Sequence, residues 1–262
     1  MEIIEAISFY ISLFFYLFSC IYGFISHFYL KKIYEKRIYF FTIFGFLFHF
    51  LAFILRWINS KHIPTIGNYE NILTGTLFLV LFILIFLKGR DKILGFLFSL
   101  SLNIILMGFV FAVPKDLRPF VASLKSFWLY IHIIFAWFSY GAFTISAGVA
   151  IAYFIKKEEN IKFEELMFKS TAFGFVMDGL MIMAGSIWAK ALWGSFWSWD
   201  PVETWSLVSF LLYGLILHLK ITLKIKPKIF AYLLIFSLIT VLISFWGVNF
   251  FMEKSYHIFN VE

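Results

Sequence analysis

The sequence predicts an all-α integral membrane protein with eight transmembrane helices, and three observations carry this prediction. Hydrophobic residues make up 62% of the 262 positions and charged residues only 14%, whereas about a quarter of the residues in soluble domains are charged. Apolar runs of roughly 20 residues, the length that crosses a bilayer, recur along the chain. The five prolines lie between these runs or at their ends, where a missing amide is harmless.

The eight predicted spans lie near residues 5–30, 38–58, 70–87, 93–113, 127–155, 172–191, 203–222 and 229–251. No soluble domain, repeat or low-complexity linker separates them, so we expect a single transmembrane helical bundle over residues 1–262. The polar segment 158–170 is too short to span. It is interpreted either as a short helix on the membrane surface or as a solvated connector.

Basic residues are distributed unequally between alternate loops. Fifteen of the 22 lysines and arginines fall in one set of loops, at residues 31–37, 88–92, 156–169 and 220–228. Cytoplasmic loops collect Lys and Arg, so this set is predicted to face the cytoplasm and both termini to lie outside. The formal charge of +7 therefore reflects membrane topology, and no nucleic-acid partner is expected. The single cysteine, Cys20, excludes a disulfide framework or a CxxC pair within one chain.

Tryptophans concentrate in the predicted external loop between the sixth and seventh spans. Five of the nine lie in SIWAKALWGSFWSWDPVETWSL, at Trp188, Trp193, Trp197, Trp199 and Trp205. An aromatic belt would distribute them over many helix ends at both interfaces. The concentration instead favours a platform for a large, flat, apolar ligand, because indole faces pack well against such rings. Composition alone does not distinguish a tetrapyrrole from a quinone or a lipid headgroup.

The carboxylates of this loop fit a helix start better than acid–base chemistry. In the order D-P-V-E, Asp200 suits the N-cap, Pro201 the first helical position and Glu203 the third. This cap would hold the loop rigidly on the seventh span. No nucleophile or general base is predicted.

The six histidines sort by predicted depth. His132 lies near the outer end of the fifth span and His257 in the outer tail, so both can reach the tryptophan loop. Imidazole is a common axial ligand of haem iron, and two are needed on opposite faces. His27 and His218 share the cytoplasmic level, where a second pair is possible.

Two histidines have no assigned role at this point. His49 lies deeper in the second span, where an ionisable side chain is costly, and no partner for it is evident. His62 stands beside Arg56 and Lys61, and this positive cluster is interpreted as a possible contact for the acidic edge of a ligand.

Several stretches resemble the haem-handling proteins of cytochrome c maturation, and within them the CcsA (ResC) type. WGSFWSWDPVETWSL is similar to the tryptophan-rich "WWD" signature of that family. Three further stretches resemble family segments that hold a histidine. The two segments with an external histidine are similar to SFWLYIHIIFAWFSYGAF, with His132, and WGVNFFMEKSYHIF, with His257. The segment with a membrane histidine is similar to YGLILHLK, with His218. RWINSKHIPTIGNYENI resembles a stretch of the second outer loop. MEKSYHIF departs from the smaller, glycine-containing approach usual in the family, and His27 has no matching family position.

The resemblance implies non-covalent haem b, held outside between His132 and His257 with its ring on the WWD region, about residues 186–206 including Asp200. It implies a subunit of a cytochrome c haem lyase (holocytochrome c synthetase) in the inner (cytoplasmic) membrane. Haem would pass to the CxxCH of an apocytochrome c, with a CcsB (ResB)-type membrane protein as partner. The alternatives are a haem exporter or chaperone, a quinone-reactive electron-transfer subunit with b-type haem, and a transporter gated by the tryptophan loop.

Overall fold

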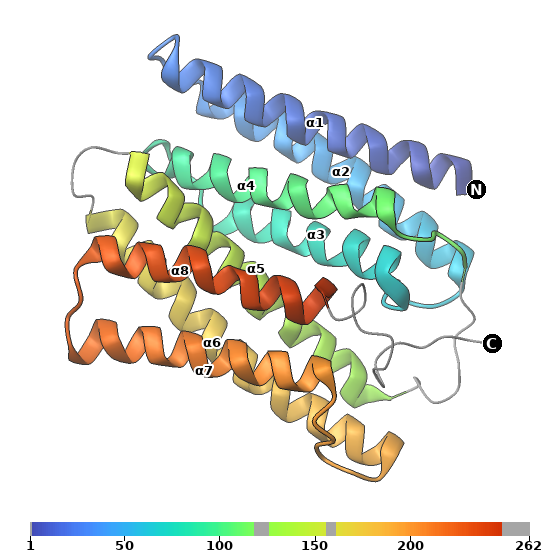
Figure 1. The fold of residues 1–262 in the computed structure, drawn as a ribbon. Helices are drawn as coiled ribbons and strands as arrows, with labels where there is room; N and C mark the ends of the chain where they lie inside the picture. The colour runs from blue at the N-terminus through green and yellow to red at the C-terminus, as the bar shows by residue number, and fades with distance from the viewer. Residues whose placement is uncertain (1, 118–125, 156–160, 248–262) are drawn as a thin grey trace. The chain divides into compact units, whose positions relative to one another are not determined.

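The computed structural model describes residues 2–117, 126–155 and 161–247, and the chain forms two compact units, Met1–Pro119 and Phe120–Glu262 (Figure 1). Within the described residues, eight helices are long and apolar enough to cross a membrane, and the regular structure is entirely helical. The predicted all-α, eight-span fold class is confirmed. The prediction of a single bundle over residues 1–262 depends on how the two units associate, and it stays a prediction.

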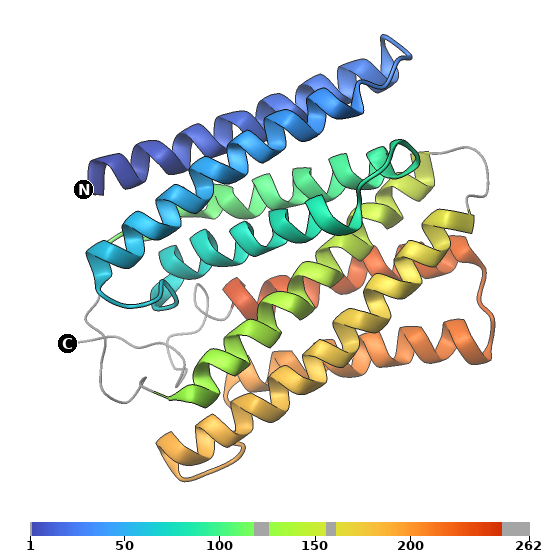
Figure 2. The same ribbon diagram turned by 180° about the vertical axis from the view of Figure 1, so that it is seen from behind.

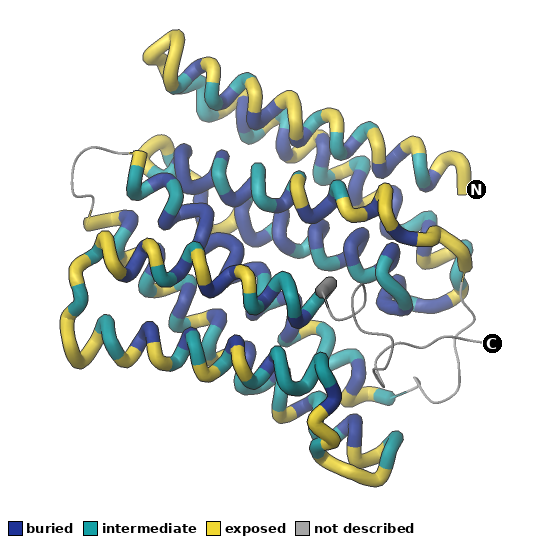
Figure 3. Tube along the Cα trace, viewed as in Figure 1, coloured by how far each residue is buried: buried dark blue, intermediate teal, exposed yellow. Residues whose placement is uncertain are grey.

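The first unit contains α1 (Glu2–Phe28), α2 (Glu35–Ser60), α3 (Gly67–Phe86) and α4 (Ile93–Gly108). Each helix packs against two of the others, because α1 contacts α2 and α4, and α3 contacts the same two helices. Short 3-10 turns at Arg90–Lys92 and Phe109–Ala112 extend α4 at both ends. Exposed residues recur along α1 (Figure 3). They include large apolar side chains such as those of Ile3, Phe14 and Ile21, as expected for lipid-facing residues.

The second unit contains α5 (Phe127–Ile155), α6 (Ile161–Trp193), α7 (Pro201–Thr222) and α8 (Pro227–Leu242), which continues into a π-helical turn at Ile243–Gly247. α5 packs against α6 and α8, and α7 packs against the same two helices. Figure 2 shows α5 and α6 side by side over most of their lengths. The proline at the first position of α7 and of α8 lies where the missing amide costs no hydrogen bond.

Small residues allow α5 and α6 to approach closely, as in other membrane helix pairs. A Cβ atom on Gly174 of α6 would lie 2.7 Å from the ring of Phe143 on α5. The buried hydroxyls of Ser146 and Thr171 form a hydrogen bond of 2.8 Å between the two helices. Phe143 also stacks on Tyr213 of α7, with ring centroids 3.5 Å apart. This packing fixes α6 and α7 relative to α5, and with them the two helix ends that flank the tryptophan loop.

The prediction of a separate surface element at 158–170 is wrong, because α6 runs without a break from Ile161 to Trp193. No proline interrupts its first turns, and the exposed pair Glu165–Lys169, 2.5 Å apart, supports them. Glu164 also forms an ion pair with Lys220 near the end of α7. With 33 residues, α6 is about 50 Å long and exceeds the hydrocarbon thickness of about 30 Å, so one helix serves as both span and polar extension.

Candidate functional site

The segment between α6 and α7 has an unusual backbone for its composition. Gly194 ends α6 in the left-handed region, at φ +77°, and its N–H bonds to the carbonyl of Lys190 at 3.1 Å, a common helix ending. Trp199 also has a positive φ, 59°, which is uncommon for a side chain of this size. Backbone of this kind persists only where its surroundings hold it in place.

The predicted capping box is confirmed, and it is what holds this segment. The Oδ1 atom of Asp200 accepts a hydrogen bond from the N–H of Val202 at 2.9 Å. Glu203 reaches back, and its Oε2 accepts from the N–H of Asp200 at 3.2 Å and from the N–H of Ser198 at 2.8 Å. The carboxylate of Glu203 therefore binds the backbone at two residues of the loop and holds them at the start of α7. Its role is structural.

The five tryptophans of this region form two layers, not one flat face. Trp188 is buried, with 2% of its surface exposed, and Trp193 meets it edge-on with centroids 5.0 Å apart. Trp197 and Trp199 meet edge-to-face at 5.8 Å, and Trp199 is 69% exposed. Trp205, in the first turns of α7, is half-buried. The outer layer is accessible to a planar ligand, whereas the inner layer supports the residues around it.

His132 is the predicted ligand that the structure places beside this loop. Its Nδ1 atom lies 2.9 Å from the carbonyl oxygen of Met181 on α6. Because a carbonyl only accepts, Nδ1 carries the hydrogen, and a neutral ring then has its lone pair on Nε2. The ring also stacks on Trp188, with centroids 6.3 Å apart and planes 22° apart. A Cβ atom on Gly185 would lie 2.7 Å from Nδ1, so this ring position requires glycine there.

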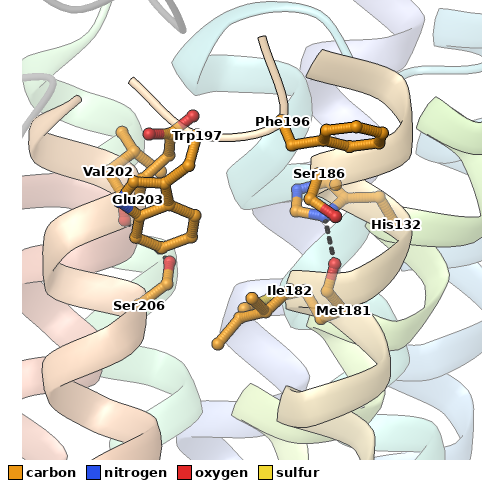
Figure 4. Close-up of a pocket in the computed structure, with 10 residues that line it drawn as sticks. His132, Met181, Ile182, Ser186, Phe196, Trp197, Val202, Glu203 and Ser206 are labelled. Atoms are coloured by element: carbon orange, nitrogen blue, oxygen red, sulfur yellow. Dashed lines mark hydrogen bonds between the residues drawn. The ribbon is translucent and has the colours of Figure 1, made fainter. Parts of the chain in front are cut away.

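A pocket opens between α6 and α7 in front of His132 (Figure 4). In Figure 4, Trp197 and Ser206 lie on the α7 side, and Ser186 and Phe196 lie on the α6 side. The free volume of about 30 Å³ suits water molecules and is far too small for a tetrapyrrole. The complete lining is His132, Met181, Ile182, Gly185, Ser186, Phe196, Trp197, Val202, Glu203 and Ser206.

Phe196 is a site residue that the reasoning from tryptophans missed. Its side chain is 57% exposed at the rim of the pocket, and the Nζ atom of Lys190 lies 5.5 Å from its ring centroid. The signal was present in WGSFWSW, where Phe196 stands beside Trp197. An aromatic ring of any type can contribute to a planar platform.

The structure does not test how the remaining candidate ligands pair. His218 lies about 25 Å further along α7 than Pro201, at 1.5 Å per residue, and its exposed ring contacts the hydroxyl of Thr222 at 3.4 Å. His27 is in the other unit, with its ring edge-on to Phe28, so the pairing of His27 with His218 stays a prediction. His257 lies outside the described residues.

His49 has the partners that the sequence did not reveal. The ring is fully buried, its Nε2 atom lies 2.9 Å from the carbonyl of Leu73, and Nδ1 lies 3.3 Å from the hydroxyl of Tyr16. The carbonyl accepts from Nε2, so Nδ1 is left to accept from Tyr16. Both ring nitrogens are thus used in joining α1, α2 and α3, which indicates a structural role.

The interpretation of Arg56 as part of a positive cluster for a ligand is wrong. Its Nε atom lies 2.8 Å from the carboxylate of Glu70 on α3. Both terminal nitrogens donate to backbone carbonyls, of Lys115 and Asp116, at 2.9 Å each. His62 is buried and lies 3.8 Å from the same Glu70. The guanidinium group is therefore committed within the first unit, because a carboxylate distant in the sequence folds against it.

Comparisons with known proteins show the family to which this chain belongs. The family model described as "Cytochrome C assembly protein" matches residues 66–255. The protein NrfI of Wolinella succinogenes is 34% identical over 231 residues, which cover 79% of this chain and 24% of NrfI. The cytochrome c biogenesis protein CcsA of Guillardia theta is 29% identical over 238 residues, covering 77% of this chain and 78% of that protein.

One solved structure shares the fold. The structure titled "Cytochrome c Heme Lyase CcmF" matches 93% of this chain with a TM-score of 0.73 at 17% sequence identity. The match covers 46% of the CcmF chain. This chain thus spans about a quarter of the length of NrfI and less than half of CcmF.

Proposed function

We propose that this chain is the haem-binding and haem-delivering membrane subunit of a cytochrome c synthetase. The chain belongs to the cytochrome c assembly protein family and is of the CcsA type. The chain is a multi-pass membrane protein with a role in cytochrome c maturation. The proposal adds that it presents haem b at the outer face of the inner (cytoplasmic) membrane, for attachment to the CxxCH of an apocytochrome c.

The observation that carries this proposal is the setting of His132. Metal-binding histidines usually donate their other ring N–H to a carboxylate or a backbone carbonyl, which fixes the ring and raises its basicity. The bond from Nδ1 to the carbonyl of Met181 at 2.9 Å is of this kind. Trp188 below the ring and Gly185 beside it restrict the imidazole to one position. These residues fit an axial ligand to haem iron.

The loop fits the other part of haem recognition, which is the face of the macrocycle. Trp199 supplies exposed aromatic surface and the half-buried Trp197 meets it edge-to-face, and the capping box of Asp200 and Glu203 keeps this surface rigid. A rigid platform loses little conformational entropy on binding. The pocket itself admits no tetrapyrrole, so haem would lie against the outer layer of tryptophans with His132 as one ligand and His257 proposed as the other.

In this function the protein contributes binding and orientation, and haem supplies the vinyl groups that form thioethers with cysteine thiols. Ligands at both axial positions would protect the iron until the histidine of an apocytochrome displaces one of them. We propose a CcsB (ResB)-type membrane protein as the partner, on the ground of family membership. The pair His27 and His218 is retained as a proposed second site at the cytoplasmic level.

Absorption spectra of the purified protein test this proposal. We expect the spectrum of six-coordinate haem with two histidine ligands, and its loss or shift in His132→Ala and in His257→Ala. His62→Ala is the matched control, because it removes an imidazole already engaged within the first unit, and its spectrum should be unchanged. Haem retained unchanged in both ligand variants would contradict the proposal and favour the electron-transfer alternative, with ligands elsewhere.

A second experiment separates a synthetase subunit from a haem exporter or chaperone. Co-expression with a CcsB-type partner and an apocytochrome c should yield covalently attached haem on the acceptor, and Trp199→Ala should reduce the yield. Trp57→Ala, which removes an exposed tryptophan of α2, is the control. Haem bound by the chain without any attachment to the acceptor would support the exporter or chaperone.

A further inference from the structure

Asp178 is an acidic side chain in the middle of α6 that the proposed haem site does not use. It is completely buried, in the stretch of α6 that lies between α5 and α7. Its carboxyl group interacts with Ser139 of α5, and electrostatically with Tyr140 of α5 and Tyr213 of α7. Ionisable groups at membrane depth are costly and usually mark a ligand site or a proton pathway.

Among the residues that the structure describes, several buried polar atoms near Asp178 have no hydrogen-bond partner. These are both carboxyl oxygens of Asp178 and the hydroxyls of Ser139 and Tyr213. In the described part of the chain, no Lys, Arg or His forms an ion pair with Asp178. The titratable groups that face it from the packed helices are Tyr140 and Tyr213, and neither is a cation. An unpaired buried carboxylate is strongly disfavoured, so the group binds a proton.

A chain of hydroxyl groups begins beside Asp178 and ends at the pocket. The hydroxyl of Tyr140 lies 3.3 Å from that of Ser244, which lies 3.2 Å from that of Ser206. Ser206 donates to the carbonyl of Val202 at 2.7 Å. Because each hydroxyl has one hydrogen, Ser206 accepts from Ser244, and Ser244 then accepts from Tyr140. All donors therefore point away from Asp178 and toward Ser206, which lines the pocket (Figure 4).

We propose that Asp178 is a proton-binding site inside the membrane-spanning bundle, which exchanges its proton with the pocket through Tyr140, Ser244 and Ser206. The carboxyl O–H bond breaks as an O–H bond forms at Tyr140. The hydrogens of Tyr140 and Ser244 each move one oxygen further. The hydroxyl of Ser206, which donates to the carbonyl of Val202, turns away from that carbonyl and passes its hydrogen to water in the pocket. One proton leaves, a carboxylate remains, and no electron moves.

The first step of this chain needs one bridging contact. Asp178 and Tyr140 interact electrostatically, but no hydrogen bond joins them. The proposal therefore requires a bridge between the two groups, and a buried water, which typically binds two to four polar groups, would supply it. A proton taken up or released here offsets a change in the charge of whatever the pocket holds. The proposal is independent of haem.

Infrared difference spectroscopy of the purified full-length protein tests the proton site. The protonated carboxyl group of Asp178 should give a C=O stretching band at neutral pH that disappears in Asp178→Asn. Asp178→Glu should restore an acid band at a shifted position, which distinguishes loss of the group from loss of the fold. A spectrum in which Asp178→Asn removes only carboxylate bands would overturn the proposal, because the site would then hold no proton.

Transfer into D₂O tests the path. Deuteration shifts the acid band, and we expect this shift to slow by roughly tenfold or more in Ser206→Ala and in Ser244→Ala, as for a barrier raised by one broken link. Ser146→Ala is the matched control, since it removes another buried, bonded hydroxyl of this unit, and its exchange rate should equal that of the unmodified protein. Equal rates in all three variants would place the path elsewhere and overturn this part of the proposal.

Discussion

Each unit buries acidic side chains among its helices, and Asp178 of the second unit differs from Glu5 and Glu70 of the first. In the first unit, Glu5 and Glu70 surround Arg56, at 3.8 and 2.8 Å. Glu70 also accepts from the backbone of Thr65 and Ile66. In the second unit, Asp178 has neither a cation nor a hydrogen bond among the described residues. A buried carboxylate with ion-pair and hydrogen-bond partners indicates a structural role. One without such partners indicates exchange of a proton or a ligand with the surroundings of the protein.

A similar contrast separates the buried His49 from the half-buried His132. His49 uses both ring nitrogens to join three helices, so nothing remains for a ligand. His132 donates through Nδ1 to a carbonyl beside a pocket, the arrangement that prepares an imidazole for a metal. Burial therefore does not by itself distinguish structural from functional polar groups, whereas the count of satisfied atoms does.

The largest effect is expected from Arg56→Met. It leaves two buried carboxylates without their cation, and breaking a buried pair in this way costs about 3–5 kcal/mol. Thermal unfolding in detergent measures the change in the free energy of unfolding. Lys169→Met is the control, because its exposed pair with Glu165 contributes about 0.5 kcal/mol or less. Equal losses in the two variants would mean that the cluster around Arg56 does not stabilise the first unit.

Gly185→Ala should have the next largest effect, and it should act on the second unit alone. The added Cβ would lie 2.7 Å from Nδ1 of His132, and overpacking of this kind costs about 1–3 kcal/mol. Displacement of the ring should also lower haem occupancy in the absorption spectrum. Gly108→Ala is the matched control, since nothing lies within 4 Å of its added Cβ. Unchanged haem binding in Gly185→Ala would argue against His132 as a ligand.

Asp200→Ala should cost about 0.5–2 kcal/mol, the usual effect of losing an N-cap. The loop before α7 should then exchange its amide hydrogens faster, as hydrogen exchange with mass spectrometry would detect. Asp200→Asn keeps the accepting oxygen for Val202 and should preserve most of the protection. If Asp200→Asn is as harmful as Asp200→Ala, the negative charge matters and the cap alone does not explain this residue.

The smallest effect on stability is expected from Asp178→Asn. The carboxyl group has no ion pair to lose, so the free energy of unfolding should change by less than about 1 kcal/mol. The same thermal measurement as for Arg56→Met checks this value. A loss as large as that of Arg56→Met would show that Asp178 has a saturated structural environment after all, and the contrast between the two units would fail.

Patterns local in the chain predicted the start of α7 correctly. Asp200, Pro201 and Glu203 form the capping box as expected, because a cap involves residues only two or three positions apart. Local reasoning failed at 158–170, where polarity predicted a surface helix or a connector separate from the sixth span, because α6 begins at Ile161. The ion pair of Glu164 with Lys220 on α7 supports those turns, and it joins residues far apart in the sequence.

Residue order alone predicts the number of spans, the tryptophan loop and its cap, and His132 as a candidate beside that loop. Hydrophobic length and capping act over short stretches and leave a direct trace in residue order. Which polar groups have hydrogen-bond or ion-pair partners depends on the tertiary structure. Arg56 finds Glu70, His49 finds Leu73 and Tyr16, and Asp178 finds no bonded partner. Hydrogen bonds between helices depend on which faces meet, and residue order does not specify that.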